Sequence, residues 1–118
     1  MDISKFMSWD YDDDLCAHVE IKVQNYFPVT IEDLYDIIQD LRIHARDMII
    51  TVDLSGVSPW SLEVRRVSEL ILNVFEYTKN DNLLSKIQFK NAGFLVRSFY
   101  RPLGTLLPEY VQDIITFI

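Results

Sequence analysis

The stretch MIITVDL, residues 48–54, decides the fold of this chain. It holds a near-continuous apolar run made of Met48, Ile49, Ile50, Val52 and Leu54. Such a run is typical of a β-strand that is covered on both faces, as the inner strands of parallel sheets are. We therefore predict that these residues form the central strand of a sheet with flanking helices.

The segment before this strand predicts a second strand and a helix. From Ala17 to Gln24 apolar and polar residues alternate, which indicates a strand with one solvent-facing side at or near an edge of the sheet. Pro28 ends this strand, and Thr30 with Asp33 matches a variant of the capping box that begins helices. Apolar residues then recur at helical spacing, so residues 31–46 are predicted to form an amphipathic helix.

The segment after the central strand continues the alternation of helices and strands. Ser58 is expected at the N-cap of a second helix, with Pro59 as its first helical residue. The inward face of this helix is predicted to carry Val64, Val67, Ile71, Val74, Phe75 and Thr78. Residues 86–90 then predict a strand with Ile87 and Phe89 inward, residues 91–93 a turn into a short or kinked third helix, and residues 114–118 a terminal strand.

This order predicts an α/β domain of the βαβαβαβ type, with a mostly parallel four-stranded sheet. We assign it to residues 16–118. Residues 1–15 have no clean period and carry Asp2, Asp10, Asp12, Asp13 and Asp14 against Lys5 alone. They are predicted to form an acidic N-terminal arm that either wraps the domain or docks on a partner.

The composition indicates which cellular compartment and which classes of partner to expect. A length of 118 residues with 49% hydrophobic content suits one domain with one core. The net charge of −7 disfavours nucleic acid as a partner. Cys16 is the single cysteine, the N-terminus has no signal-peptide pattern, and no apolar run approaches the length of a transmembrane segment. We therefore expect a soluble, cytoplasmic protein.

No catalytic motif is present, so we expect no enzyme activity and no cofactor. The three glycines form neither a P-loop nor a dinucleotide-binding fingerprint, and no nucleophile-elbow motif occurs. The acidic run around Asp12 lacks the glycine and the glutamate of an EF-hand loop. Cys16, His18 and Glu20 share one face of the predicted strand, but three such residues on an exposed strand are interpreted as surface residues and not as a metal site.

Two stretches resemble known families. Residues 50–58, ITVDLSGVS, resemble the strand-to-helix junction of STAS domains, the fold of anti-sigma-factor antagonists, and equally a stretch in the second half of CRAL-TRIO domains. The spacing of apolar residues from Leu84 to Phe117 also resembles the CRAL-TRIO pattern. Residues 60–63 depart from the phosphorylatable STAS motif, and lipid-carrying CRAL-TRIO domains are longer than this chain. The resemblance therefore implies the sheet topology of these families more than their activity.

The expected function is a non-catalytic protein-interaction or scaffold domain, such as a component of a virion or of another multisubunit complex. The predicted docking surfaces for a protein partner or a second copy of the chain are the loop from Ser55 to Ser61, the acidic arm and the edge strand. The predicted contact residues are Ser55, Ser58, Trp60, Ser61, Arg97, Arg101, Asp12, Asp13 and Asp14. The alternative is a domain that binds a small ligand, a nucleotide or a lipid head group, at the same loop near Arg97 and Arg101.

Overall fold

The structure is a computed structural model, and it describes residues 3–57, 61–80, 82–91 and 114–118. Its strands and α-helices are β1 (Met7–Tyr11), β2 (Cys16–Lys22), α1 (Ile31–His44), β3 (Asp47–Asp53), α2 (Leu62–Thr78), β4 (Leu84–Lys90) and β5 (Ile115–Phe117). Two short 3-10 helices, η1 (Ile3–Lys5) and η2 (Val23–Asn25), follow the same chain order. The fold is α/β, as the sequence predicted.

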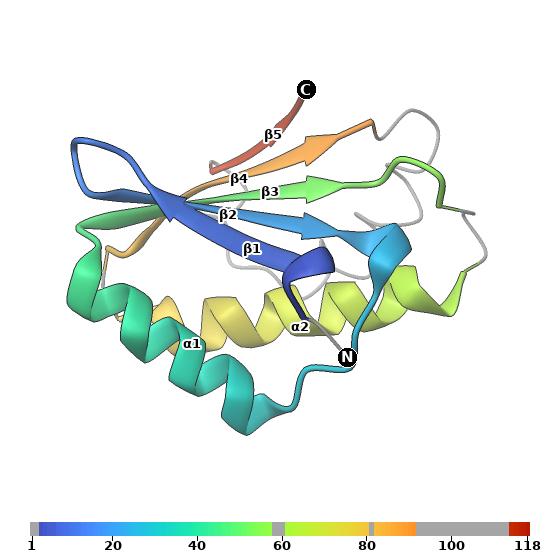
Figure 1. The fold of residues 1–118 in the computed structure, drawn as a ribbon, viewed down its shortest axis with the longest axis horizontal. Coiled ribbons are helices and arrows are strands. Elements are labelled where there is room, and N and C mark those ends of the chain that lie inside the picture. Colours follow the sequence, from blue (N-terminus) through green and yellow to red (C-terminus); the bar gives the residue numbers. More distant parts are fainter. Residues whose placement is uncertain (1–2, 58–60, 81, 92–113) are drawn as a thin grey trace.

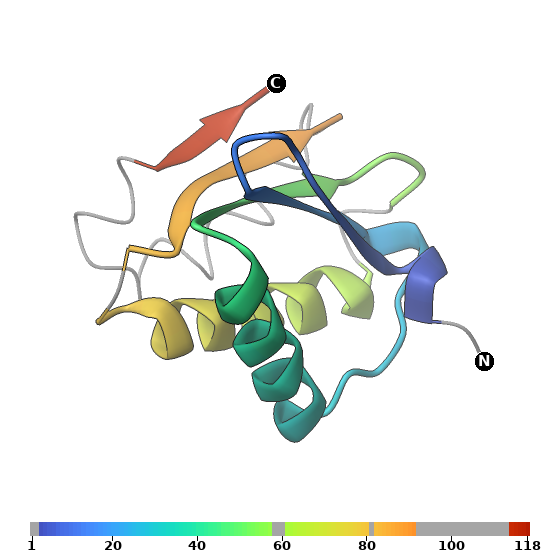
Figure 2. The ribbon, with the colours of Figure 1, turned by 60° about the vertical axis from the view of Figure 1, so that its left-hand side comes forward.

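The five strands form one sheet in the order β1-β2-β3-β4-β5. The four strands from β2 to β5 run parallel, and β1 pairs antiparallel with β2. Each parallel strand is added on the same side of the previous one, and right-handed crossovers then place successive helices on the same face of the sheet. Figures 1 and 2 show α1 and α2 together on one face.

The helices explain why burial alternates along β3. Met48, Ile50 and Val52 are buried against the helices, whereas the residues between them are half-buried. The prediction of a strand covered on both faces is therefore wrong for the described residues. The apolar run correctly predicted the central strand. It looked continuous because Ile49, which is apolar, lies half-buried on the face away from the helices.

Both helix positions follow from capping and apolar spacing. Thr30 caps α1, because its Oγ1 accepts a hydrogen bond from the amide of Asp33 at 3.1 Å, as predicted. Every residue predicted on the inward face of α2 is buried. The predicted start of α2 at Pro59 is wrong, since the helix begins at Leu62 with Ser61 at the N-cap. Its first buried residue is Val64, so the packing that stabilises the helix begins only there.

The N-terminal residues differ from the expected arm. Residues 7–11 form the edge strand β1, paired with β2 from Met7 opposite Ile21 to Tyr11 opposite Ala17. Phe6 and Met7 belong to the core, at 1% and 3% exposure, and the ring of Phe6 meets that of Tyr26 edge to face. The sequence MSWDY alternates apolar and polar side chains, which is the pattern of a half-buried strand. The domain therefore includes these residues, and its sheet has five strands.

The C-terminal half of the chain is described in part. Ile87 and Phe89 of β4 are buried as predicted, and β5 pairs with β4 from Ile115 opposite Ile87 to Phe117 opposite Phe89. The predicted third helix lies outside the described residues. In the ranges that the structure describes, no helix has the length and apolar character needed to cross a membrane.

Candidate functional site

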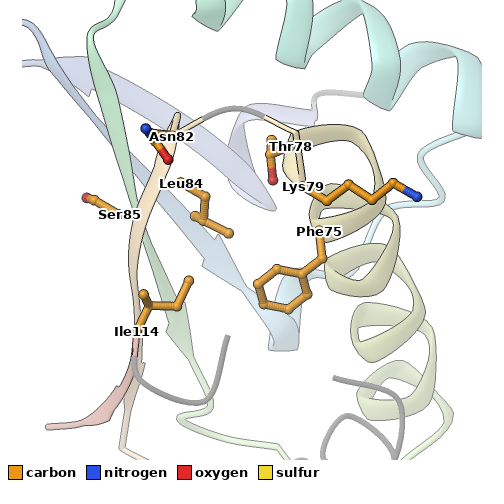
Figure 3. A pocket seen from close by; sticks show the side chains of 7 residues that line it. All are labelled: Phe75, Thr78, Lys79, Asn82, Leu84, Ser85 and Ile114. Atoms are coloured by element: carbon orange, nitrogen blue, oxygen red, sulfur yellow. The ribbon is translucent and has the colours of Figure 1, made fainter. Parts of the chain in front are cut away.

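A pocket of about 550 Å³ lies between the end of α2 and the start of β4. Figure 3 shows the ring of Phe75 pointing from α2 toward the sheet, with the side chains of Leu84 and Ile114 facing it from the other side. Among the residues that the structure describes, Thr78, Lys79, Asn82 and Ser85 also line the pocket. The volume lies within the range of ~300–1,000 Å³ that is usual for small-molecule sites.

The polar side chains around this pocket are largely engaged with the protein itself. The Thr78 hydroxyl donates to the carbonyl of Val74 at 2.8 Å, and the Ser85 hydroxyl donates to the carbonyl of Met48 at 3.1 Å. Lys79 runs away from the pocket in Figure 3, and its Nζ lies 2.8 Å from Glu76 Oε1. The surface that is left to meet a ligand is therefore mainly the apolar one.

The loop predicted as the partner site is described only in part. Ser55 is exposed, and its amide donates to Asp53 Oδ1 at 2.9 Å. Gly56 has a φ of +71°, a backbone conformation that favours glycine, and a Cβ there would displace the end of the Gln24 side chain. Ser61 is the N-cap of α2 but makes no side-chain capping bond. Ser58, Trp60, Arg97 and Arg101 lie outside the described residues.

A polar network joins this loop to the end of β4. Asp53 Oδ1 also accepts from Asn91 Nδ2 at 3.0 Å, and Lys90 lies 4.0 Å from Asp53 Oδ2. Burial raises the pKa of Asp53, but the hydrogen bonds from Asn91 and Ser55 and the charge of Lys90 outweigh it, so the pKa is lowered overall. This network holds the carboxyl ends of β3 and β4 together and is a structural feature.

The three predicted acidic residues occupy the turn between β1 and β2. Asp13 and Asp14 are exposed, whereas Asp12 is held in place. Asp12 Oδ1 accepts from the amides of Asp14 and Cys16 at 2.9 and 3.0 Å, and its Oδ2 lies 2.9 Å from His18 Nε2. The hydrogen bond with His18, followed by those from the amides, holds the pKa of Asp12 below its usual value.

Cys16 lies at the start of β2, directly behind this turn. Its side chain is buried, with the residue only 7% exposed. Burial, followed by a hydrogen bond to Asp47 and the charge of that carboxylate, raises the pKa of the thiol to about 11. Asp47 is opposite Cys16 in the pairing of β2 with β3.

Sequence reasoning missed both the pocket and this grouping. The pocket joins Phe75 and Thr78, which were assigned to the core, with residues at the start of β4, and no local pattern indicates that their packing leaves a gap. The grouping of Asp12 with Cys16 had a signal in the sequence. The alternation in residues 7–11 and in residues 17–24 is separated by a short polar turn, which is typical of a hairpin. A hairpin places Asp12 next to Cys16.

The comparisons with known proteins support the fold. No family model matches the chain, and no curated protein matches it. Solved structures do match, among them the crystal structure of Sfh5, a protein with the CRAL-TRIO fold, at a TM-score of 0.66 and 13% sequence identity. The match covers 98% of this chain, which spans 48% of the length of the Sfh5 chain. This chain therefore has a CRAL-TRIO-like α/β fold, whereas the resemblance to STAS domains gains no support.

Proposed function

We propose that this chain is a non-catalytic domain that binds a small amphiphilic ligand, with the apolar part of the ligand in the pocket between α2 and β4. The observation that carries the proposal is the pocket itself, about 550 Å³ in volume and walled by Phe75, Leu84 and Ile114. Burial of apolar surface stabilises a complex by roughly 25 cal/mol per Å², so a walled apolar space favours an acyl chain over a nucleotide.

The fold supports the same ligand class. CRAL-TRIO domains, which the sequence resembles, include carriers of lipids, and the chain shares their fold. Nucleotide binding would call for a phosphate-binding turn, and the glycines of this sequence offer none of the known motifs. The proposed ligand is therefore a fatty acid or a lipid with a small head group, the head group lying near the exposed lining residue Asn82.

The test is a titration of the purified chain with a fluorescent fatty acid. Leu84→Trp fills the pocket from the β4 side, and we expect it to weaken binding by at least about tenfold, since a filled pocket loses its contact area. Ile31→Trp places the same side chain at the exposed first residue of α1 and is the matched control. Its affinity should equal that of the unmodified chain.

Thermal unfolding of both variants separates occupancy of the pocket from damage to the fold. Equal binding by Leu84→Trp and the unmodified chain, with both folded, would contradict the proposal. A fluorescent nucleotide in place of the fatty acid distinguishes the two ligand classes, and saturable nucleotide binding that Leu84→Trp abolishes would overturn the choice of an amphiphile.

A second function, self-association of the chain, is favoured by an apolar patch at the β1–β2 hairpin and the last turn of α1. Tyr11, Leu15 and Ile43 are 40%, 50% and 77% exposed. The ring of Tyr11 is 6.2 Å from that of His44, the residue next to Ile43, and the amide of Arg46 donates to the carbonyl of Leu15 at 2.9 Å, so the hairpin lies against the C-terminal end of α1. Exposed apolar patches with a polar rim mark interaction surfaces, and the rim here is Asp12–Asp14.

We propose a second copy of the chain as the partner at this patch. Sedimentation of the unmodified chain over a range of concentrations should show a dimer, and Ile43→Asp should remove it by placing a charge in the apolar centre. Ile31→Asp, at the exposed first residue of α1, is the control and should leave the dimer intact. A chain that stays monomeric at all concentrations would contradict this second function.

A further inference from the structure

The hairpin between β1 and β2 brings together three side chains that ligate metals. Asp12 from the turn and Cys16 and His18 from β2 place a carboxylate oxygen, a thiol sulfur and an imidazole nitrogen within 4.8 Å of one another. Cys16 and His18 lie on the same face of β2 because they are two residues apart in a strand. The turn folds Asp12 back over that face, its amide donating to the carbonyl of Cys16 at 3.0 Å.

We infer that Asp12, Cys16 and His18 form a binding site for one Zn²⁺ ion. Zinc takes sulfur, nitrogen and oxygen ligands in tetrahedral geometry, at about 2.0 to 2.3 Å, which sets ligand atoms about 3.3 to 3.8 Å apart. Asp12 Oδ2 and His18 Nε2 now lie 2.9 Å apart, in a hydrogen bond that the ion would replace. All three ligand atoms therefore reach tetrahedral positions by movements on the order of 1 Å.

The carboxylate of Asp12 is positioned before any ion arrives. Its Oδ1 accepts two backbone hydrogen bonds, from Asp14 and Cys16, and these leave Oδ2 directed at His18. Hydrogen bonds of this kind orient metal ligands and raise the affinity of the sites they support. The three ligand residues lie within seven positions of one hairpin, so binding of the ion costs little additional backbone entropy.

The surroundings favour a cation and supply a fourth ligand. A pocket of about 400 Å³ next to Cys16 is lined by Asp12, Asp14, Asp47 and Arg46, which gives three carboxylates against one guanidinium. Binding of Zn²⁺ would displace the proton of the Cys16 thiol to solvent, and the resulting thiolate together with Asp12 would neutralise the two charges of the ion. The neighbouring carboxylates attract the ion from solvent. Asp47, opposite Cys16 on β3, or a water molecule in the pocket would complete the tetrahedron.

Glu20 is not part of the site, although it shares the strand face with Cys16 and His18. Its carboxylate oxygens lie 3.6 Å from Lys22 Nζ and 3.7 Å from Lys90 Nζ, so it belongs to the lysine cluster at the other end of β2. The sequence placed Cys16, His18 and Glu20 on one strand face and predicted surface residues there; in the structure Asp12, and not Glu20, completes a group of three possible ligands with Cys16 and His18. Glu20 therefore serves as a control residue in the experiment.

The experiment titrates the untagged full chain with Zn²⁺ in competition with a chromophoric chelator, and repeats it with Co²⁺. We expect one ion per chain with a dissociation constant of about a micromolar or lower. The cobalt form should show a thiolate-to-metal charge-transfer band and the intense visible bands of tetrahedral coordination. Cys16→Ser and His18→Gln should each weaken Zn²⁺ binding at least about tenfold, and Cys16→Ser should also remove the charge-transfer band.

Asp13→Asn and Glu20→Gln remove a neighbouring carboxylate without touching the proposed ligands, and both should bind within about twofold of the unmodified chain. Circular dichroism shows whether each variant is folded. We expect His18→Gln to fold because His18 is half-exposed, and Cys16→Ser to fold because serine is close to cysteine in size. Three results would overturn the site: millimolar or weaker binding, full affinity in Cys16→Ser and His18→Gln, or an equal loss in Asp13→Asn, which would indicate attraction to the acidic turn alone.

Discussion

At the scale of single residues, Leu15 has a backbone conformation that residues other than glycine rarely adopt. Its φ is +61°, in a turn closed by a hydrogen bond from its amide to the carbonyl of Asp12 at 3.1 Å. The left-handed region costs a residue with a Cβ about 1–2 kcal/mol. The side chain of Leu15 is half exposed and offsets little of that strain by packing.

We therefore expect Leu15→Gly to raise the free energy of unfolding by about 0.5–1 kcal/mol, less than the full strain because glycine loses more backbone entropy on folding. Urea denaturation measures the change. Ile43→Gly is the matched control, since Ile43 is an exposed apolar residue of α1 in ordinary helical conformation, and that change should lower stability by about 0.5–1 kcal/mol. Destabilisation by Leu15→Gly would show that packing of the leucine outweighs the strain.

Asp53 links the stability of the fold to pH. Its pKa is lower in the folded chain than its usual value, because hydrogen bonds from Asn91 and Ser55 and the charge of Lys90 outweigh the effect of burial. A folded-state pKa below the unfolded one gives stability that is fully present above the unfolded pKa and is lost as pH falls through the folded pKa. The contribution of Asp53 should therefore fade below about pH 4.

The check is urea denaturation of the unmodified chain and of Asp53→Asn at several pH values from about 6 down to about 3. Asp53→Asn should be less stable near neutral pH, and the difference should shrink as the medium becomes acidic. Asp36→Asn removes an exposed carboxyl group of α1 and is the control for net charge. A constant difference between Asp53→Asn and the unmodified chain across the pH range would exclude a role for this carboxylate.

At the scale of elements, β3 shows how strongly the two faces of the sheet differ. Val52 is fully buried beneath the helices at 0% exposure, and its neighbour Thr51 is half-buried on the far face, where its hydroxyl donates to Gln88 Oε1 at 3.3 Å. Val52→Asp would place a carboxylate in the core without a partner, at a cost of several kcal/mol, and should abolish folding. Circular dichroism recorded during heating shows whether the variant still has a cooperative unfolding transition.

Thr51→Asp is the matched control on the same strand, because water reaches that face and can solvate the carboxylate. We expect this variant to keep a cooperative transition at a lower midpoint. Equal effects of the two substitutions would mean that both faces of β3 are packed alike, which was the prediction made from the apolar run alone.

The elements also show what the sequence could reveal. The helices were predictable, because Val64, Val67, Ile71 and Val74 repeat at a period that only one face of a helix satisfies. The strand β1 was missed because its five residues are few and the aspartates beside them dominate the composition. The helices cover one face of the sheet because each parallel strand is added on the same side of the one before. That order of strands is a property of the whole topology, and no local sequence pattern indicates it.

The same limit applies to the candidate sites. A pocket is the volume left between packed side chains, so its size depends on how α2 is placed against the sheet as well as on side chains such as Phe75 and Leu84. The ligands of the proposed zinc site were visible as residue types, and their grouping required knowledge that residues 7–22 form a hairpin. The fold was thus easier to predict than the sites, because a period in the sequence specifies an element, while a site needs the packing of several.

At the scale of the whole molecule, the sheet has β1 at one edge, paired with β2 over five residues. This strand pairs with β2 and contributes Met7 to the core, and Phe6, the residue before the strand, is buried there as well. Each large apolar side chain that is fully buried stabilises a domain by about 1.5–3 kcal/mol. Two such residues and one strand of backbone pairing amount to a large part of the ~5–15 kcal/mol that separates folded from unfolded domains.

Deletion of residues 1–14 should therefore remove the cooperative thermal transition or lower its midpoint strongly, in contrast to the behaviour of a detachable arm. It should also promote self-association, because β2 then becomes an unpaired and largely apolar edge strand, and such edges pair with other chains. Thermal unfolding and light scattering measure the two effects, with deletion of residues 1–2 as the control, since Phe6 and β1 remain. If the truncated chain unfolded at the same temperature as the intact one and stayed monomeric, Phe6 and Met7 would contribute little to the core, and the N-terminal residues would act as a separate arm after all.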